Sequence, residues 1–382
     1  MVMLRKAARG VFVSSYIILV IVFLAASVAT ALNPSQYWWV GFNGLIYPFI
    51  LLAVFLMTAL MLFYRPRFAL MGILAMIVSY QDIGALIAFN RSTKFKIEKQ
   101  NNHIRVMTWN IRRFALYYDY HFDRMRNNVD SILLEVNKYS PDVLCLQEFY
   151  SSHGKNNNNI EEIKRKGGFS YHTFSSRDTS HRRWQSGTII FSKYPILRTY
   201  TYNLPKEISS TSERPVFTDI VANNDTIRIG TVHLESYGFL GRDYADFSKI
   251  KNQEDKNLQA SKKIFWKMRN AFSLRGKQVD IIRQKMEEST YPVILCGDLN
   301  DVPNSYAYFK VRKNMKDAFL EKGMGLGKSY YSGQSRSLAW LPTLRIDYIF
   351  ADTAFNISQF TMGTKNLSDH RVVITDVELP KK

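Results

Sequence analysis

The nearly uncharged N-terminal region is the feature that most constrains this chain. Residues 1–90 contain five basic residues and a single acid, Asp82, although the whole chain of 382 residues carries 51 bases and 32 acids. Residues 11–32 are apolar and uncharged over a length that can cross a bilayer, and two further apolar segments follow at 41–63 and 68–89. The sequence therefore predicts a multi-pass integral membrane region with about three transmembrane helices, followed by a sizeable globular domain.

Two features of the membrane region leave alternatives open. Ala29-Thr30-Ala31 has the small residues of a signal-peptide cleavage site, but the apolar run before it is long for a signal peptide, which favours a retained helix. In the third segment Asp82 follows Gln81, and an acid at the centre of a span costs about 2.5–3.5 kcal/mol on insertion scales. Asp82 would therefore need a polar partner, a water-filled cavity or a position near the membrane surface.

The basic residues predict the orientation in the membrane. The basic N-terminus and the turn with Arg65 and Arg67 both prefer the cytoplasm. Three spans then place the globular domain on the extracytoplasmic side, and signal cleavage followed by two spans gives the same result. Two spans without cleavage would leave the domain inside, which the basic linker at 91–103 mildly favours. We expect three spans and an extracytoplasmic domain.

From residue 104 the pattern changes to alternating strands and helices. Apolar residues at helical spacing predict a helix over 122–136, residues 151–168 are predicted as a loop, and 251–288 as a basic, partly helical insertion. Strands are expected at 104–111, 142–148, 188–191, 216–221, 226–233, 293–298, 346–350 and 372–377. Many strands with few helices predict an α+β sandwich over 104–382, in which helices flank two packed sheets.

The globular part of the chain is strongly basic. After the first 90 residues, the remaining 46 bases and 31 acids give a formal charge of +15. Such a domain is attracted to polyanions, either nucleic acid or an anionic membrane surface, and the charge does not choose between them. Cys145 and Cys296 both lie in apolar strand patterns, so we expect buried thiols rather than a disulfide or a metal site.

Polar groups gather where the predicted strands end. Gly297-Asp298-Leu299-Asn300 follows a buried strand, and alone it is typical of a turn. Five other segments carry similar groups, each with an ordinary structural explanation when taken singly. The candidate site residues are Asn110, Glu148, His233, Asp298, Asn300, Asp347, Asp369 and His370. Together they offer carboxylate and amide oxygens, which suit Mg²⁺ or Mn²⁺ rather than zinc, and histidines with acids that can orient them.

In their order along the chain, these segments resemble the motifs of the endonuclease/exonuclease/phosphatase superfamily. That group includes DNase I-like nucleases, AP endonucleases, inositol-phosphate phosphatases and neutral sphingomyelinases. The motifs are TWN, LQE, TVHL, GDLN, RIDYIF and SDH, and the resemblance covers about residues 104–377. It implies a four-layered α/β sandwich of two mainly antiparallel sheets flanked by helices. It also implies a phosphoester hydrolase that depends on Mg²⁺ or Mn²⁺.

The resemblance implies which residues lie near the metal. Glu148 matches the principal metal carboxylate, Asn110 matches an amide near the metal and phosphate, and Asp369 matches a further acid on the metal side. Arg214, in Ser-Glu-Arg-Pro-Val-Phe, is either a phosphate contact or an ordinary surface arginine.

The resemblance also implies catalytic roles. Asp298 matches the acid that orients or deprotonates the attacking water, and Asn300 matches a residue that holds the phosphate. His370 matches the histidine that stabilises the transition state, with Asp347 fixing its imidazole. His233 matches a histidine that contacts the phosphate or protonates the leaving group, and AP endonucleases typically differ at this position.

Three functions fit these features. A membrane anchor favours a phosphodiesterase that acts on a phospholipid or a lipid-linked headgroup. The basic charge favours equally a membrane-tethered nuclease that acts on DNA or RNA. An inactive, membrane-tethered binding module is the third, although no matched position carries an inert residue. The lipid bilayer is an expected partner in each case, and the sequence does not identify protein partners.

Overall fold

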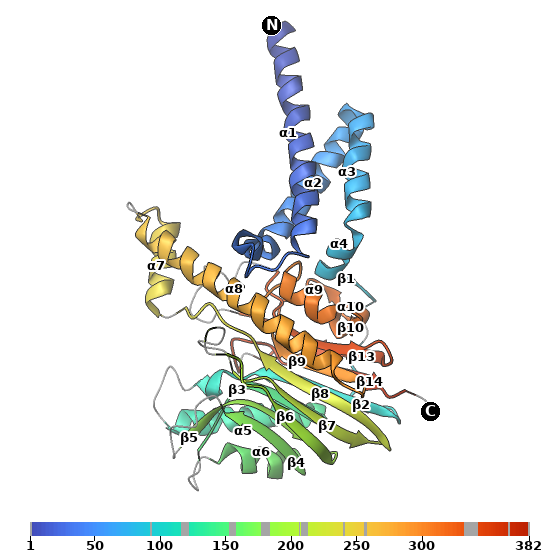
Figure 1. The fold of residues 1–382 in the computed structure, drawn as a ribbon, viewed down its shortest axis with the longest axis vertical. Coiled ribbons are helices and arrows are strands. Elements are labelled where there is room, and N and C mark those ends of the chain that lie inside the picture. Colours follow the sequence, from blue (N-terminus) through green and yellow to red (C-terminus); the bar gives the residue numbers. More distant parts are fainter. Residues whose placement is uncertain are drawn as a thin grey trace.

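A bundle of N-terminal helices stands on a two-sheet sandwich (Figure 1). In this computed structural model the described residues are 2–91, 94–115, 122–152, 158–176, 184–205, 207, 213–239, 241–255, 258–331, 343–365 and 367–380. The bundle consists of α1 (Val2–Ala29), η1 (Trp38–Phe42), α2 (Asn43–Tyr64), α3 (Pro66–Val78) and α4 (Tyr80–Leu86). The chain leaves the bundle through a two-residue strand, β1 (Ala88–Phe89), which pairs with β11 (Met324–Gly325) of the sandwich.

The bundle exposes large apolar side chains and holds a hydroxyl pair within a mostly apolar core. Large side chains such as Leu52 and Leu74 are exposed on its surface, whereas Tyr16 and Thr58 are buried and share a hydrogen bond of 3.0 Å between their hydroxyls. A Cβ on Gly72 would come within 2.1 Å of the Thr58 Oγ1, so glycine allows α3 to approach its neighbours closely. Small and polar residues at helix contacts, with apolar residues outside, are typical of helices packed in lipid.

Two helical stretches are long and apolar enough to cross a membrane. These are Ala7–Ala29 and Trp38–Tyr64. The expected third span, 68–89, is a bent pair in which α3 and α4 meet at 66°, and its last residues belong to β1. Asp82 lies beyond the bend, where its carboxylate accepts a 3.3 Å hydrogen bond from Thr30 Oγ1. The acid thus has a polar partner at the end of the bundle that meets the sandwich.

Each sheet has six strands and one parallel pair at its centre. The first sheet runs β10 (Met315–Asp317), β12 (Asp347–Asp352), β9 (Val293–Asp298), β8 (Asp225–His233), β7 (Val216–Ala222), β6 (Ile196–Thr201). The second runs β13 (Asn356–Met362), β14 (Val373–Glu378), β2 (His103–Asn110), β3 (Val143–Ser152), β5 (Trp184–Ser192), β4 (Tyr171–Ser176). Only β8–β9 and β2–β3 are parallel among these described pairs. The predicted mainly antiparallel sheets are therefore confirmed.

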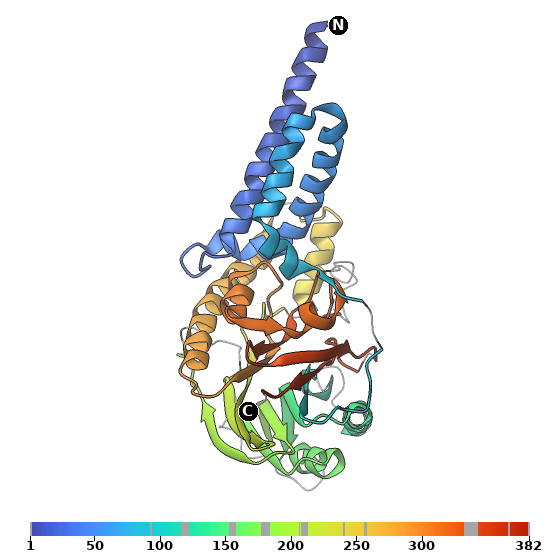
Figure 2. The ribbon, with the colours of Figure 1, turned by 90° about the vertical axis from the view of Figure 1, so that its right-hand side faces the viewer.

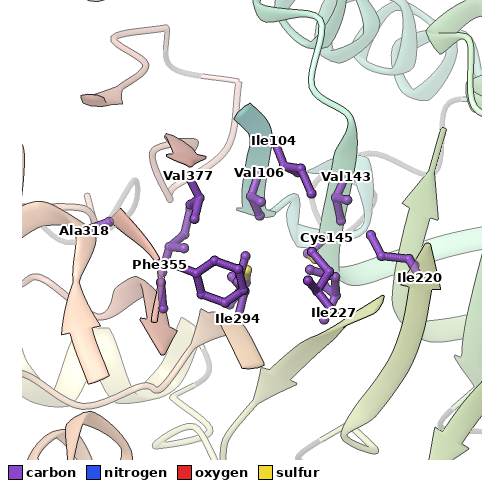
Figure 3. Packing of buried hydrophobic residues seen from close by; sticks show 14 of the residues in the cluster. Ile104, Val106, Val143, Cys145, Ile220, Ile227, Ile294, Ala318, Phe355 and Val377 are labelled. Carbon is purple, nitrogen blue, oxygen red and sulfur yellow. The ribbon is translucent and has the colours of Figure 1, made fainter. Parts of the chain in front are cut away.

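Helices cover the outer face of each sheet, which completes the four predicted layers. The core between the sheets is built from apolar side chains of both, including Val106, Val143 and Ile294 (Figure 3). On the second sheet, α5 (Phe122–Tyr139) and α6 (Asn159–Gly167) bury a separate apolar cluster. On the first, α8 (Gln259–Glu287) and α9 (Tyr306–Arg312) do the same. Short α7 (Gly241–Lys251) and α10 (Ala318–Lys322) complete the α-helices in the described part of the chain, which also has the 3-10 helix η2 (Arg112–Ala115).

The prediction of a loop over 151–168 is wrong. β3 extends to Ser152 and α6 occupies Asn159–Gly167, while 153–157 lie outside the described residues. Asn158 caps α6 by accepting a hydrogen bond from Glu161 N–H, and Gly168 ends it in the left-handed conformation. The asparagine and glycine that suggested a loop are therefore the two caps of a short helix.

Polar contacts join the bundle to the sandwich. The buried Arg345 guanidinium donates to the carbonyl of Ala85 in α4 and to Asp317 Oδ2 at 2.9 Å. Asn33, between α1 and η1, donates to Asp280 Oδ2 of α8 at 2.7 Å. The basic segment from 251–288, predicted as partly helical, is dominated by α8, which also packs against η1 through the Phe42–Phe272 ring pair.

Candidate active site

The carboxyl ends of the two central parallel pairs bring the candidate residues together. Asn110 ends β2, His233 ends β8 and Asp298 ends β9, with His233 and Asp298 directly opposite each other in register. Beneath them, the Gln147 amide of β3 donates to Thr108 Oγ1 at 3.0 Å and, across the sandwich, to Thr231 Oγ1 at 2.8 Å. Because parallel strands end at the same edge of a sheet, two facing parallel pairs deliver four strand ends to one place.

The Asn110 side chain bridges carboxylates of the two sheets. Its Nδ2 donates to Asp298 Oδ2 at 3.0 Å and to Glu148 Oε1 at 3.2 Å. Its Oδ1 accepts the backbone N–H of Arg112 at 3.0 Å, which fixes the direction of the amide. Two carboxylates thus converge on a single small group.

Glu148 occupies an irregular position in β3. The pairing of β3 with β5 shifts register between Leu146 and Phe149, and Glu148 has a positive φ of 48°. Such bulges re-aim a side chain, and backbone strain of this kind gathers at functional sites. Glu148 is also the most accessible of the acids around Asn110, with its side chain 26% exposed.

Gly297 and Asn300 shape the backbone on either side of Asp298. Gly297 has φ +132°, and a Cβ there would lie 2.0 Å from the carbonyl oxygen of Val232. The Asn300 N–H donates to Asp298 Oδ1 at 2.7 Å, while its side-chain amide donates to the Leu234 carbonyl at 2.9 Å. The amide expected at a phosphate therefore holds together the loops that follow β8 and β9.

Asp298 is fully buried between two histidines. Burial raises its pKa to about 6, although the nearby His370 opposes this shift. His370 Nε2 lies 3.6 Å and His233 Nε2 3.8 Å from Asp298 Oδ2. The carboxylate is therefore a base whose pKa lies close to neutrality, flanked by two potential proton donors.

Asp347 holds the His370 ring. Both Asp347 oxygens lie 3.0 Å from His370 Nδ1. Burial alone would lower the pKa of His370, but Asp347 and Asp298 outweigh it and raise the pKa to about 10. Asp347 begins β12, where its N–H and that of Ile346 donate to Ser329 Oγ. His370 is therefore a fixed imidazolium at neutral pH, with Nε2 directed toward Asp298.

His233 has a second acid, Glu213, which the sequence analysis missed. Glu213 Oε2 lies 3.6 Å from His233 Nδ1 and accepts the backbone N–H of Glu148 at 3.1 Å. Burial would lower the pKa of His233, but Glu213, Asp298 and Glu148 raise it to about 9. The only sequence signal for Glu213 was its place beside Arg214, whose side chain is half-buried and whose carbonyl accepts a hydrogen bond from Thr188 Oγ1 at 3.2 Å.

Asp369 forms an ion pair with an arginine. Its Oδ2 pairs with Arg112 Nη1 at 3.2 Å. The preceding Ser368 donates to the Asn110 carbonyl at 2.7 Å, which ties this loop to the end of β2. Asp369 thus lies beside the site, but its carboxylate is occupied by a guanidinium.

Two groups of residues have the donors that a cation needs. Ligand atoms of Asp298, Asp347 and His370 all lie within 4.8 Å of one another. In this group, however, Asp347 is already engaged by the imidazole at both oxygens. Glu148 Oε1 and Asp298 Oδ2 both accept from the Asn110 amide and lie 4.0 and 3.8 Å from His233 Nε2. Glu148, the more accessible of the two, therefore offers a carboxylate oxygen of the kind that Mg²⁺ or Mn²⁺ prefers, with a second acid beside it.

Comparison with known proteins assigns the sandwich. The Endonuclease/Exonuclease/phosphatase family matches residues 107–370, a range that includes all eight candidate residues. The chain belongs to this family. Members of the endonuclease/exonuclease/phosphatase family are phosphoester hydrolases, typically with a divalent metal. Residues 9–86, which form most of the bundle, match a separate family described as a domain of unknown function.

Solved structures agree with the fold. A family member from Beutenbergia cavernae is 18% identical with a TM-score of 0.51, and the match covers 73% of this chain and 72% of that one. A member from Bacteroides vulgatus is 16% identical with a TM-score of 0.52, and the match covers 72% of this chain and 99% of that one. No curated protein matches the chain.

Proposed function

We propose that this protein is a membrane-anchored, divalent-metal-dependent phosphodiesterase that hydrolyses a phospholipid or a lipid-linked headgroup. The observation that carries the catalytic part is the convergence of Glu148 and Asp298 on the Asn110 amide, with His233 and His370 within 4.0 Å of those carboxylates. The apolar bundle carries the membrane part.

The residues divide into binding and proton-handling groups. Glu148, with Asn110 beside it, would hold the cation, and Asp369 would join only by releasing Arg112. Mg²⁺ or Mn²⁺ would supply Lewis-acid stabilisation of the phosphoryl oxygens. Asp298 orients and deprotonates the attacking water. His370, held by Asp347, donates to the phosphoryl oxygens as charge develops, and His233 protonates the leaving oxygen.

The bundle supports placing this chemistry at a membrane, on its extracytoplasmic side. Its helices expose apolar residues on α1, α2 and α3, including Ile18, Leu56 and Ile77. Soluble proteins rarely expose so large an apolar surface. The N-terminus and the Arg65–Arg67 turn lie at the end of the bundle far from the sandwich (Figure 2). If these basic ends are cytoplasmic, the catalytic domain lies outside.

Two substitutions test the site. Glu148→Gln and His370→Ala should each abolish hydrolysis of a generic phosphodiester by detergent-solubilised protein, since each removes a group for which the fold offers no substitute. Glu161→Gln, on the exposed face of α6, is the matched control and should retain activity. Equal melting temperatures would show that folding is intact. Full activity in either site variant would refute the site.

Metal removal is a second test. Chelation should abolish activity, and Mg²⁺ or Mn²⁺ should restore it and raise the melting temperature, because a ligand bound only by the folded state stabilises that state. Glu148→Gln should weaken this thermal shift. Metal-independent activity would contradict the proposed role of the cation.

A membrane-tethered nuclease is the second candidate, favoured by the formal charge of +15 after residue 90. Assays of the solubilised full chain on plasmid DNA and on mixed phospholipid vesicles separate the two. Hydrolysis of DNA alone would contradict the proposed lipid substrate, but it would still support the proposed phosphodiester-hydrolysing site.

A further inference from the structure

An aromatic and basic surface lies where the bundle meets the sandwich. We call it the platform, and it consists of Trp38 and Trp39 in η1 and of Phe265, Trp266 and Arg269 in α8. Trp39 and Trp266 are 54% and 57% exposed, and Trp38 is 39% exposed. Exposed tryptophans gathered at one place on a chain are unusual, since burying such side chains is strongly favourable in water.

The platform is an ordered cluster rather than a set of separate side chains. Phe265 stacks on Phe42 with ring centroids 5.3 Å apart, and packs edge-on against Trp38 at 5.4 Å. The Arg269 guanidinium lies over both Trp38, at 5.2 Å, and Trp266, at 4.5 Å. Trp38 and Trp266 are therefore held in place, with the Arg269 guanidinium between them.

The segment that carries the α8 part of the platform is basic. Residues 241–269 contain eight bases and four acids, a formal charge of +4. Lys263 and Lys267 pair with Asp243, at 2.9 and 2.7 Å, and the net charge of +4 already includes this acid. Lys262 is exposed beside the platform. The remaining excess is complementary to an anionic surface.

The platform is level with the ends of the candidate spans. η1 opens the apolar stretch Trp38–Tyr64, and it directly contacts α8 through the Phe42–Phe272 pair at 5.1 Å. Both ribbon views place the start of α8 at the end of the sandwich nearest the bundle (Figures 1 and 2). Tryptophan and tyrosine favour this depth of a membrane, where one part of the ring is apolar and the other hydrated.

We propose that the platform lies in the headgroup layer of the bilayer that the bundle crosses and binds anionic phospholipid there. This inference rests on the membrane anchoring proposed above and adds a second, peripheral contact made by the catalytic domain itself. Its aromatic rings enter the interface, while Arg269 and Lys262 contact lipid phosphates.

One helix connects the platform to the site. Further along α8, the buried Arg275 donates to the Glu235 carbonyl at 2.8 Å and to Asp301 Oδ2 at 3.3 Å. Glu235 lies two residues after His233, and Asp301 lies three residues after Asp298, so Arg275 contacts the loops that follow β8 and β9. Because α8 holds the loops after both strands, contact at the platform sets the distance between the membrane surface and the site.

Site-specific quenching tests the proposal on the full chain in vesicles of phosphatidylcholine and phosphatidylglycerol. Cys145 and Cys296 are buried, so a fluorophore can be attached to single introduced cysteines. The positions are Lys262→Cys at the platform, Leu52→Cys on the outer face of α2, and Gln284→Cys near the other end of α8. Gln284 lies about 33 Å along the helix from Lys262, in the last turn of α8, and this end of α8 lies away from the bundle (Figure 2).

We expect headgroup-nitroxide lipids to cause a loss of fluorescence at Lys262→Cys, mid-chain-nitroxide lipids to do so at Leu52→Cys, and neither at Gln284→Cys. Replacing phosphatidylglycerol by phosphatidylcholine should reduce the loss of fluorescence at Lys262→Cys, but not the loss at Leu52→Cys. Quenching at Leu52→Cys without quenching at Lys262→Cys would overturn the platform and leave the anchor intact. No quenching at any position would overturn the anchor too. Protection of Lys262→Cys by added DNA instead of quenching by lipid would assign the surface to nucleic acid and also overturn the proposal.

Discussion

At the residue scale, Asp298 is a buried carboxylate that two histidines approach from different sheets. His233 ends β8 in the first sheet, and His370 lies three residues before β14 of the second. Each histidine has its own acid on the opposite ring nitrogen, Glu213 for His233 and Asp347 for His370. Asp347 orients the His370 ring by hydrogen bonding, and both outer acids raise the pKa of their histidine, which leaves the Nε2 side of both rings for the reaction.

Asp347→Asn tests this orientation through pH. The pKa of His370 is about 10, and Asp347 is the largest of the causes that raise it. If His370 acts as a cation, activity is present below this pKa and lost above it. Removing the carboxylate leaves burial less opposed, so the pKa falls and the basic limb of the kcat/KM profile should move to lower pH. Asp352→Asn, at the other end of β12, should leave the limb in place; an unmoved limb in Asp347→Asn would contradict the role of His370.

Glu213→Gln tests the acid behind His233. Its carboxylate accepts the N–H of Glu148 and faces the His233 ring, so the amide should disturb both the cation ligand and the proton donor. Loss of such a supporting partner typically lowers metal affinity or activity about 10–100-fold. Titrating the activity of the variant and of the wild type with Mn²⁺ measures both the apparent metal affinity and the turnover. Unchanged metal affinity and unchanged turnover would show that Glu213 has no positioning role.

The candidate residues were predictable where they ended apolar strands and matched family motifs, as Asn110, His233 and Asp298 do. Glu213 was missed because it precedes a strand, where a charged residue is unremarkable in sequence. The sequence also did not predict that the Asn300 amide donates to the Leu234 carbonyl, or that Asp369 pairs with Arg112. In both cases the partner comes from a distant segment of the chain. Strand ends predict proximity, but not which hydrogen bond each group makes.

At the element scale, every strand predicted from sequence is an interior strand of its sheet. β2, β3, β5 and β14 of the second sheet were expected, as were β7, β8, β9 and β12 of the first. The four edge strands were not: β4, β6, β10 and β13. Interior strands are covered on both faces and read as continuous apolar runs. Edge strands such as β6 expose most of their residues, and their sequences resemble loops.

Gly297→Ala should show how closely β8 and β9 must approach. At φ +132° a Cβ strains the backbone and would also meet the Val232 carbonyl at 2.0 Å. We expect a loss in the free energy of unfolding greater than the about 1–3 kcal/mol of backbone strain alone. Gly168→Ala is the matched control, because it combines positive φ with open space. Denaturant unfolding of the solubilised proteins compares them, and equal losses would mean that the close strand contact is unimportant.

At the scale of the whole molecule, the bundle and the sandwich are joined by more than the linker. Arg345 reaches from the sandwich to α4, Asn33 from the bundle to α8, and β1 pairs with β11. The sequence indicated apolar spans and a following domain, but gave no sign of these contacts, because each joins residues hundreds of positions apart. The bend between α3 and α4 was also missed, since hydropathy reports length and not direction.

Cysteine labelling tests the predicted sidedness. Glu161→Cys lies on the exposed face of α6, and Tyr64→Cys beside the turn at the far end of the bundle. An impermeant maleimide should label Glu161→Cys in intact spheroplasts and Tyr64→Cys only after permeabilisation. The reverse pattern would place the catalytic domain in the cytoplasm and contradict three spans with cytoplasmic basic ends.

The pairing of β1 with β11 has a kinetic consequence. It fastens the chain to the sandwich directly after α4, so the enzyme has no long tether on which to swing toward distant targets. A lipid substrate must then arrive by lateral diffusion within the leaflet. Turnover should consequently follow the mole fraction of substrate in the bilayer and stay constant when vesicles of fixed composition are diluted in buffer.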